Sequence, residues 1–472
     1  MRKTKIICTL GPACDDESLL REMIQNGLDC ARLNFSHGTH EEQLVRINRV
    51  KKIREELGIP LPILLDTKGP EIRVRTFKNG KIVLKKGQEF TFSPDFDLVG
   101  DETIVGLTYP NLGLYVKPGV IILADDGKAS FEVVRIDGKN VVTKVLNDTS
   151  LSNRKSINIP NVIIDMPYVS ETDKSDIIFG CENCVDFIAA SFVRRPEDVL
   201  DIRRLVEEYD KSGKIQIIAK IENTEGIAKM DEIIAVSDGI MVARGDMGVE
   251  VPFKMLPKIQ KELIEKCYRS GKIVVTATQM LDSMQQNPRP TRAEVSDVAN
   301  AIYDGTTAIM LSGESAAGLY PLQSVEAMRD IADFTESNID YRRKYYLNDL
   351  ELGSDFLSAI CNAAVNASYQ VNAKAIICVT NHGQTALKIA AFRPNCPIIA
   401  ITVNEKACRQ LNLVWDCYPV YAEKKNSLDE LFLYAIETAI KTGIVKKGDC
   451  VIITGASSVG DAVTDTIKIH TI

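Results

Sequence analysis

The sequence has no long apolar run and no strong excess of positive charge. Among its 472 residues, no stretch approaches the roughly 18 consecutive apolar residues that a membrane-spanning helix needs. The opening residues, MRKTKIICTLGP, are basic but carry too short an apolar segment for a secretory signal peptide. The formal net charge of -7 gives no reason to expect nucleic acid or an anionic membrane as a partner. We therefore expect a cytoplasmic protein.

Cysteine is present, but it does not form a recognisable disulfide or metal framework. The 12 cysteines are scattered through segments that are predicted to be strands and helices. One close pair, Cys181 and Cys184, falls in the turn before a predicted strand. With no second pair and only 4 histidines in the chain, this pair is a weak zinc signal. We interpret it as structural.

Eight short apolar runs recur along the chain, and each ends in a polar residue that a plain core would not need. Such runs of Val, Ile, Leu and Ala are typical of strands buried on both faces of a parallel sheet. Because helix-length segments lie between them, they predict a (β/α)8 barrel with its chemistry at the C-terminal strand ends. The runs are Lys5–Leu10, Asp29–Asn34, Pro62–Asp66, Val185–Ser191, Ile215–Glu222, Gly239–Asp246, Lys272–Thr278 and Ala308–Glu314.

The barrel pattern is interrupted between residues 70 and 167, where polar and apolar residues alternate and NG, DG and PG turns recur. This segment is predicted to be a β-barrel-like insertion. Because it follows a barrel strand, it would lie over the catalytic face and could close as a lid. Its predicted strands are Lys81–Leu84, Glu89–Phe92, Gly119–Leu123, Ala129–Val134 and Asn140–Val145.

A third domain is predicted at residues 341–472, reached through a charged helical stretch at Ile331–Leu347. Strands at Ala375–Val379, Ile398–Thr402 and Val451–Thr454 alternate there with helices, which is the order of an open α/β sheet. The fold class is therefore α/β. The barrel would comprise residues 1–69 and 168–340, and the lid domain residues 70–167.

Three charged residues near the ends of consecutive predicted strands indicate metal and phosphate chemistry. The barrel would bring the carboxylates of Glu222 and Asp246 to one rim, and two oxygen ligands with open positions suit Mg²⁺ or Mn²⁺. Lys220 lies two residues before Glu222, so both side chains share one face of the strand. A lysine there would stabilise a phosphoryl group in transfer. Each residue alone could form an ordinary salt bridge, but the three together favour a site.

No Walker A motif is present, because the nearest match, GASSVG at residues 455–460, is followed by Asp461 rather than lysine. A nucleotide would therefore not be held by a P-loop. The segment ARGDMG at residues 243–248 instead offers backbone N–H groups at a predicted helix start, which suits a carboxylate.

Several longer strings carry a specific resemblance. They are KIICTLGPA, ARLNFSHG, LLDTKGPEIR, DFIAASFVR, IIAKIEN, GIMVARGDMGVEVP and TATQMLDSM, followed by PRPTRAEVSDVANAIYDGT and IMLSGES. Their order and spacing resemble those of pyruvate kinases, and the resemblance runs from residue 3 to the closing TDTIKIHTI. The chain is identified as a member of this family, of the bacterial type, and without the phosphohistidine-type extension of some bacterial members.

The resemblance implies in-line phosphoryl transfer from phosphoenolpyruvate to ADP, followed by protonation of the enolate to pyruvate, which is the final step of glycolysis. It implies that Lys220 stabilises the transferring group, that Glu222 and Asp246 hold Mg²⁺ or Mn²⁺, and that Arg32 contacts phosphate. A K⁺ site is implied at Asn34, Ser36, Asp66 and Thr67.

The remaining implied contacts concern the substrates. Thr278, with the segment Ala243, Arg244 and Gly245, would hold the substrate carboxylate on the face where the enolate is protonated. Ser312, at the end of the last barrel strand, is counted with the catalytic residues. Nucleotide contacts are implied for Asn34, His37, Arg73 and Lys155.

The resemblance also implies regulation and assembly. A phosphorylated effector would bind the loop formed by Thr380, Asn381, His382, Gly383, Gln384 and Thr385, with the uncharged partner loop at residues 455–458. Because these loops lack the basic residues found in bisphosphate-activated animal forms, a monophosphate is favoured over fructose 1,6-bisphosphate. A homotetramer is expected. Glu71 is the residue type of K⁺-dependent members, and Thr307 stands where the family usually has Asp.

Two rival hypotheses stay open on the residues alone. A barrel lyase or aldolase would also bind a pyruvate-like acid through a carboxylate-held Mg²⁺, but it would show no ADP-dependent turnover. A metabolite sensor with an inactive barrel would retain only the third domain's ligand site. The presence of Lys220, Glu222, Asp246 and Thr278 argues against the sensor.

Overall fold

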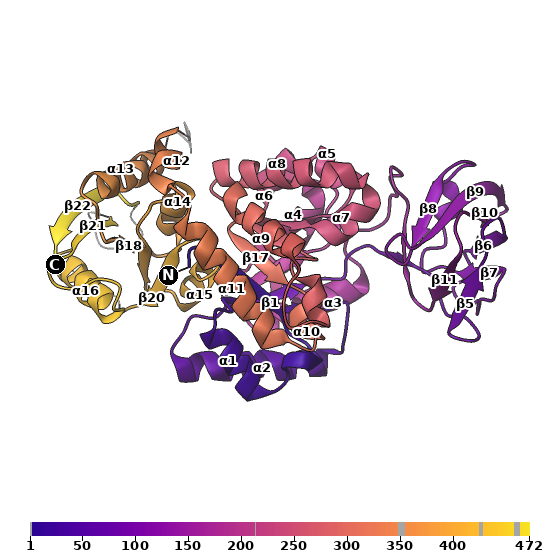
Figure 1. Cartoon of the computed structure of the whole chain (residues 1–472), viewed down its shortest axis with the longest axis horizontal. Helices are drawn as coiled ribbons and strands as arrows, with labels where there is room; N and C mark the ends of the chain where they lie inside the picture. The colour runs from indigo at the N-terminus through magenta and orange to yellow at the C-terminus, as the bar shows by residue number, and fades with distance from the viewer. Residues whose placement is uncertain (1, 213, 348–354, 424–427, 457–462) are drawn as a thin grey trace.

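The computed structural model describes residues 2–212, 214–347, 355–423, 428–456 and 463–472. Three domains lie in a row, with the barrel between the inserted β domain and the C-terminal domain (Figure 1). Among the described residues, no helix combines the length and the apolar character needed to cross a lipid bilayer.

The predicted runs form a closed parallel barrel in the order β1-β17-β16-β15-β14-β13-β3-β2, which confirms the (β/α)8 prediction. Most strands end slightly before the predicted runs do, so the polar residues lie at or just past the strand ends. The strands are β1 (Lys5–Thr9), β2 (Cys30–Asn34), β3 (Ile63–Asp66), β13 (Phe187–Ala190), β14 (Gln216–Ile221), β15 (Gly239–Ala243), β16 (Ile273–Ala277) and β17 (Ala308–Leu311).

The barrel helices begin and end at residues that the sequence marks clearly. Thr39 and Glu42 form a capping box at the start of α2, which Gly58 ends at a positive φ of 63°. Thr291 and Glu294 cap α9 in the same way. The helices are α1 (Glu17–Gln25), α2 (His40–Leu57), α3 (Glu171–Glu182), α4 (Pro196–Tyr209), α5 (Thr224–Ala228), α6 (Met230–Val236), α7 (Arg244–Glu250), α8 (Leu256–Arg269), α9 (Arg292–Asp304), α10 (Gly313–Ala316) and α11 (Pro321–Ser337), with 3₁₀ turns η1 (Pro12–Cys14), η3 (Phe253–Met255) and η4 (Asp282–Gln285); a further 3₁₀ turn, η2 (Leu112–Leu114), belongs to the inserted domain.

The inserted domain is a curled β structure, as the alternating sequence predicts. A seven-stranded sheet runs β4-β12-β8-β9-β10-β6-β7, and a bridge between Val74 and Leu107 joins the segments that follow its two edge strands. Phe90, Phe92 and Phe131 pack against one another in its core. The strands are β4 (Ile72–Arg73), β5 (Lys81–Leu84), β6 (Glu89–Ser93), β7 (Ile104–Gly106), β8 (Ile121–Ala124), β9 (Ala129–Asp137), β10 (Asn140–Val145), β11 (Thr149–Ser152) and β12 (Ser156–Asn158).

The C-terminal domain is an open sheet in the order β20-β19-β18-β21-β22, with β22 antiparallel to its neighbour. The predicted helical stretch Ile331–Leu347 divides into the end of α11 and a separate α12. Two edge strands, β20 and β22, were not predicted. The elements are α12 (Tyr341–Leu347), α13 (Phe356–Gln370), β18 (Ala375–Val379), α14 (Gln384–Ala391), β19 (Ile398–Thr402), α15 (Glu405–Leu411), β20 (Cys417–Tyr421), α16 (Leu428–Lys441), β21 (Cys450–Gly455) and β22 (Thr466–Thr471).

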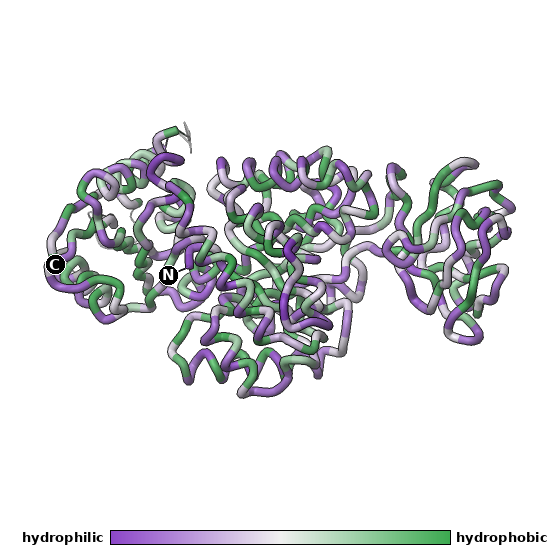
Figure 2. The backbone as a smooth tube through the Cα atoms, viewed as in Figure 1, coloured by the Kyte–Doolittle hydropathy of each residue, from purple (hydrophilic) through white to green (hydrophobic). Residues whose placement is uncertain are grey.

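Apolar segments concentrate along the barrel strands and the strands of the C-terminal sheet (Figure 2). One cluster lies between the barrel strands and their helices. A second runs from inside the barrel, at residues such as Phe187 and Met310, into the C-terminal domain, at residues such as Ile376 and Val414. The inserted domain has a core of its own. Lys5 Nζ, at the start of β1, donates to the Cys417 carbonyl at 2.8 Å, so the C-terminal domain packs on the N-terminal end of the barrel and the C-terminal strand ends face away from it.

Candidate active site

Lys220 lies at the centre of a buried charge cluster on the C-terminal rim of the barrel. Its Nζ is 3.0 Å from Asp66 Oδ1, 3.2 Å from Glu222 Oε1 and 2.7 Å from Ser191 Oγ. Burial alone would lower the pKa of Lys220, but Asp66 and Glu222 outweigh it and hold the pKa above its ordinary value. The 3.2 Å contact confirms that Lys220 and Glu222 share one face.

Glu222 and Asp246 supply carboxylate oxygens that protein groups do not fully use. The side chain of Glu222 is completely buried, and its Oε2 accepts the Phe192 N–H at 2.6 Å. Its Oε1 accepts no hydrogen bond from the described residues. Burial raises the pKa of Glu222 to about 7. The positive charge of Lys220 opposes this shift, and the negative charge of Asp246 adds to it. Burial also raises the pKa of Asp246, in the first turn of α7.

The carboxylates of Glu222 and Asp246 fit a divalent cation. A cation would be coordinated by Glu222 Oε1, which accepts no hydrogen bond, and would relieve the repulsion between the two buried carboxylates. In the part of the chain that the structure describes, no group of three or more His, Cys, Asp or Glu side chains is placed to hold a metal ion.

Arg32 and Asp66 form a second part of the cluster. The Nε of Arg32 donates to Asp66 Oδ2 at 2.7 Å, and its Nη1 donates to Thr9 Oγ1 at 2.7 Å. Burial would raise the pKa of Asp66, but Arg32 and Lys220 outweigh it and lower the pKa. Asp66 is therefore ionised and shared between two cationic side chains.

The four residues predicted to hold K⁺ lie around the ends of β2 and β3. Asn34 and Asp66 are paired in the barrel register, and the Oδ1 of Asn34 accepts the Ser36 N–H at 3.1 Å. The carbonyl oxygen of Thr67 accepts the Ser191 hydroxyl at 2.6 Å. Asn34 and Asp66 are thus neighbours on adjacent strands, and amide, hydroxyl, carboxylate and carbonyl oxygens are donor types that suit a hard cation.

Thr278 directly follows β16 in a left-handed conformation with φ 67°, which is strained for a β-branched residue. Its Oγ1 donates to the Ala277 carbonyl at 2.6 Å and accepts the Gly245 N–H at 2.7 Å. The strain therefore aims the hydroxyl at the start of α7. Arg244 turns away, because its Nη1 is 2.5 Å from Asp297 Oδ2 and its Nη2 donates to the Thr278 carbonyl at 2.6 Å.

Ser312 follows the last barrel strand, and its N–H donates to Glu314 Oε2 at 2.7 Å. Its buried hydroxyl has no hydrogen-bond partner among the described residues. Because an unpartnered buried hydroxyl costs free energy, this group is available to a ligand or a water.

The predicted nucleotide contacts lie where the inserted domain joins the barrel. Arg73 Nε donates to Glu71 Oε2 at 2.8 Å, and Lys155 Nζ is 2.8 Å from Asp125 Oδ1. Arg73 is paired in register with Ser156, the residue after Lys155, so the two cationic residues lie on neighbouring segments of the junction. His37 is exposed in the loop after β2.

Comparisons with known proteins agree with this geometry. Family models for the pyruvate kinase barrel domain and the pyruvate kinase alpha/beta domain match residues 1–325 and 358–470. The chain belongs to the pyruvate kinase family. A relative named pyruvate kinase from Sporosarcina psychrophila is 49% identical over all of this chain and 81% of its own length. Those from Bacillus licheniformis and Geobacillus stearothermophilus are 46% and 47% identical, over 81% and 80% of their lengths.

As a pyruvate kinase, the chain is a phosphotransferase that converts phosphoenolpyruvate and ADP into pyruvate and ATP. The lyase and sensor hypotheses are therefore set aside. The matched relatives are longer, so the chain spans about four fifths of their length.

The predicted effector loop of this pyruvate kinase lies at the carboxyl end of β18. The sheet order reverses between β18 and β21, and ligands of open α/β sheets bind at such a switch point. Thr380 Oγ1 accepts the Gly383 N–H at 3.0 Å, and the hydroxyls of Thr385 and Thr464 are 2.8 Å apart. In the partner loop, residues 457 and 458 lie outside the described residues.

Two residues with clear contacts in the site were not assigned a role from the sequence. Ser191 contacts Lys220, Asp66 and Thr67, and only its place at the end of a barrel strand could have marked it. Phe192 presents its N–H to Glu222 from a positive φ of 55°. Apolar side chains give no sequence signal for a backbone contact of this kind.

Proposed function

We propose that Lys220 stabilises the phosphoryl group as it passes from phosphoenolpyruvate to ADP. The charge of Lys220 is fixed by Asp66 and Glu222, within 3.0 and 3.2 Å. A preorganised charge of this kind acts most strongly in a site that excludes water. Arg32, held by Asp66 and Thr9, would contact the phosphate from the neighbouring strand.

Glu222 and Asp246 would hold Mg²⁺ or Mn²⁺, and this role is supported by the buried Glu222 Oε1, which accepts no hydrogen bond from the described residues and contacts only Lys220 as an ion pair. When bound, the dication supplies positive charge to the developing enolate and to phosphate oxygens. Asn34, Ser36, Asp66 and Thr67 would hold K⁺.

The substrate carboxylate would bind at the start of α7, at the backbone of Ala243, Arg244 and Gly245. The Gly245 N–H, which now reaches Thr278 Oγ1, would donate to the carboxylate, and the Thr278 hydroxyl would turn to the enolate face. Arg244 would act through its backbone, because its guanidinium group is held by Asp297. Ser312 would complete a proton path from the rim.

Asn34, His37, Arg73 and Lys155 would contact the nucleotide, and the inserted domain would close over it. Asn158 Nδ2 donates to Glu250 Oε1 at 3.0 Å, which links the inserted domain to the end of α7. Closure would exclude water from the transferring group. The boundaries 69/70 and 167/168 would delimit this moving part, and residue 341 would begin the C-terminal domain.

The effector loop from Thr380 to Thr385 would bind a phosphorylated metabolite, with a monophosphate favoured because the loop itself carries no lysine or arginine. The active form would be a homotetramer.

A coupled assay with phosphoenolpyruvate and ADP tests this assignment. Turnover should require a divalent cation, rise with K⁺, and respond to one or more of a panel of sugar phosphates and AMP. Pyruvate formation that is independent of ADP would contradict the transfer step. Turnover unaffected by chelation of divalent cations would contradict the role of Glu222 and Asp246.

A further inference from the structure

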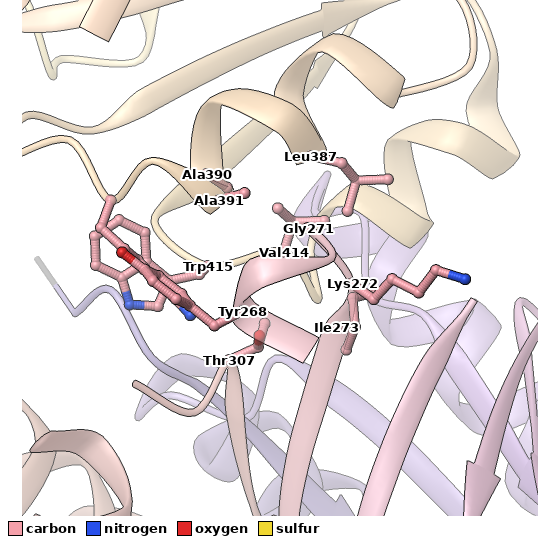
Figure 3. A pocket seen from close by; sticks show the side chains of 11 residues that line it. Tyr268, Gly271, Lys272, Ile273, Thr307, Leu387, Ala390, Ala391, Val414 and Trp415 are labelled. Atoms are coloured by element: carbon pink, nitrogen blue, oxygen red, sulfur yellow. The ribbon is translucent and has the colours of Figure 1, made fainter. Parts of the chain in front are cut away.

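A cavity lies between the barrel and the C-terminal domain, at the opposite end of the barrel from the catalytic rim. Tyr268, Gly271 and Thr307 line it from the barrel, and Leu387, Ala390 and Trp415 line it from the C-terminal domain (Figure 3). A second, larger cavity of about 360 Å³ is also lined by Tyr268 and Trp415 and opens toward α12. Arg393 lines both cavities.

Arg393 is buried with two nitrogens unused. The exposed fraction of Arg393 is only 7%. Nη2 donates to the Gly305 carbonyl at 2.6 Å, but Nε and Nη1 have no hydrogen-bond partner among the described residues. The guanidinium lies 4.4 Å from the Trp415 ring centroid and 5.4 Å from that of Tyr268. Because a buried, unpaired N–H group is unfavourable, these two nitrogens call for an acceptor.

The charges around the larger cavity do not supply that acceptor. Asp304 Oδ1 is paired with Lys261 and Glu265 with Arg269, and although Asp304 Oδ2 has no hydrogen-bond partner, neither carboxylate forms an ion pair with Arg393 among the described residues. Lys344 donates to the Tyr303 carbonyl at 2.9 Å and adds a further positive charge. Burial lowers the pKa of Arg393, which shows the cost of keeping this cation desolvated.

We propose that this cavity binds a small oxyanion, a phosphate or a carboxylate, on the free N–H groups of Arg393. The site is separate from the effector loop, because the loop precedes α14 and Arg393 follows it. An anion here would contact the C-terminal domain through Arg393 and the barrel through residues beside Gly305 and Thr307. It would therefore strengthen the junction between the two domains.

Thr307 does not supply an acceptor to Arg393 from the barrel side. Its Oγ1 accepts the Val274 N–H at 3.2 Å, so its hydroxyl serves the barrel backbone. An aspartate at this position would place a carboxylate on the cavity wall. The threonine leaves Arg393 without one.

Trp415 is the single tryptophan of the chain, so its fluorescence reports on this cavity alone. The full-length protein is titrated with inorganic phosphate in one arm and acetate in the other, at constant ionic strength maintained with chloride. We expect a saturable change in Trp415 emission and a rise in melting temperature in at least one arm. The arm that saturates identifies the class of anion.

Three variants decide the assignment. Arg393→Met should abolish the saturable change, and Thr307→Asp should abolish or weaken it at least tenfold, because an internal carboxylate would compete. Arg342→Met removes an exposed arginine of α12 that does not line the cavity, and it should bind like the natural chain. The proposal is overturned if neither anion gives a saturable change in the natural chain. It is equally overturned if the change persists in Thr307→Asp and in a folded Arg393→Met.

Discussion

Both rims of the barrel carry buried charged side chains, but the two rims use them differently. On the rim away from the catalytic site, buried carboxylates of the barrel form ion pairs with side chains of the C-terminal domain. Arg409 Nε donates to Asp186 Oδ1 at 2.7 Å, and Lys406 Nζ is 2.8 Å from Asp210 Oδ2. On the catalytic rim, Glu222 Oε1 and the Ser312 hydroxyl have no hydrogen-bond partner among the described residues, and Glu222 Oε1 has only its ion pair with Lys220.

The comparison teaches that a buried charge is not by itself a sign of function. A completed pair such as Arg409 and Asp186 holds two domains together, whereas a cluster with oxygens left over is prepared for something that is not protein. Arg393 is an exception on the rim that faces the C-terminal domain, because it is a buried charged side chain whose Nε and Nη1 have no hydrogen-bond partner among the described residues. The predictions below test the comparison by removing charges from each rim.

The largest effect is expected for Lys220→Met. It should lower kcat on the order of 10²-fold or more, because the missing charge matters most as the bond to phosphorus breaks. Binding of Mg²⁺ and substrate should be largely retained. Lys406→Met is the matched control, since it removes a buried lysine from the other rim and should keep kcat within a few fold. Near-normal kcat in a folded Lys220→Met protein would refute the role of Lys220.

On the structural rim, Arg409→Met should lower the free energy of unfolding by about 3 kcal/mol and leave kcat nearly unchanged. The substitution strands the Asp186 carboxylate, which is completely buried. Chemical denaturation measures the loss, and Arg204→Met, which removes an exposed surface pair, should cost less than about 1 kcal/mol. A loss of activity without a loss of stability would mean that the two rims are not distinct.

The pH dependence of metal binding sharpens the contrast. Burial and Asp246 hold the pKa of Glu222 near 7, so the side chain is protonated below that pH and ionised above it. Mg²⁺ needs the ionised form, and its affinity should therefore fall about tenfold per pH unit below 7 and level off above it. Calorimetric titration from pH 5.5 to 8.5 measures this. An affinity that does not change across this range would show that proton and metal do not compete at Glu222.

A smaller effect is expected at the K⁺ site. Asn34, Ser36 and Thr67 offer uncharged oxygens, and the Asp66 carboxylate is shared with Lys220 and Arg32. Glu71 adds a further carboxylate, which Arg73 partly offsets. Activity should be low in Na⁺ and rise with K⁺, whereas Glu71→Lys should raise the basal rate severalfold and flatten the K⁺ response. One K⁺ titration on both proteins at fixed ionic strength is sufficient. Equal K⁺ dependence in the two would rule out charge substitution.

The parts of the molecule that the sequence predicts well are those with strong local signals. The barrel strands are continuous apolar runs, and the turns of the inserted domain are marked by Gly80, Gly119, Gly127 and Gly138, all at positive φ. The strands that were missed have weak signals. β20 contains Pro419, which argues against a strand, and β22 lies at an edge with an exposed, mixed sequence.

For the site, residue types and strand ends predicted which side chains gather, but not which of their atoms are already used. The sequence does not reveal that the Arg244 guanidinium forms an ion pair with Asp297, or that Thr278 adopts a strained backbone conformation. Those facts depend on contacts between segments that are distant in sequence. They are also what separates a side-chain role from a backbone role.

The continuity of the hydrophobic core has a consequence for cooperativity. Because one buried cluster passes from the barrel interior into the C-terminal domain, these two domains should unfold together, as a single thermodynamic unit. The inserted domain has its own core and joins the barrel through two chain crossings, so it can open or unfold without exposing theirs. The chain thus combines a rigid two-domain body that can transmit strain with an independent third domain that can move without loss of the body's stability.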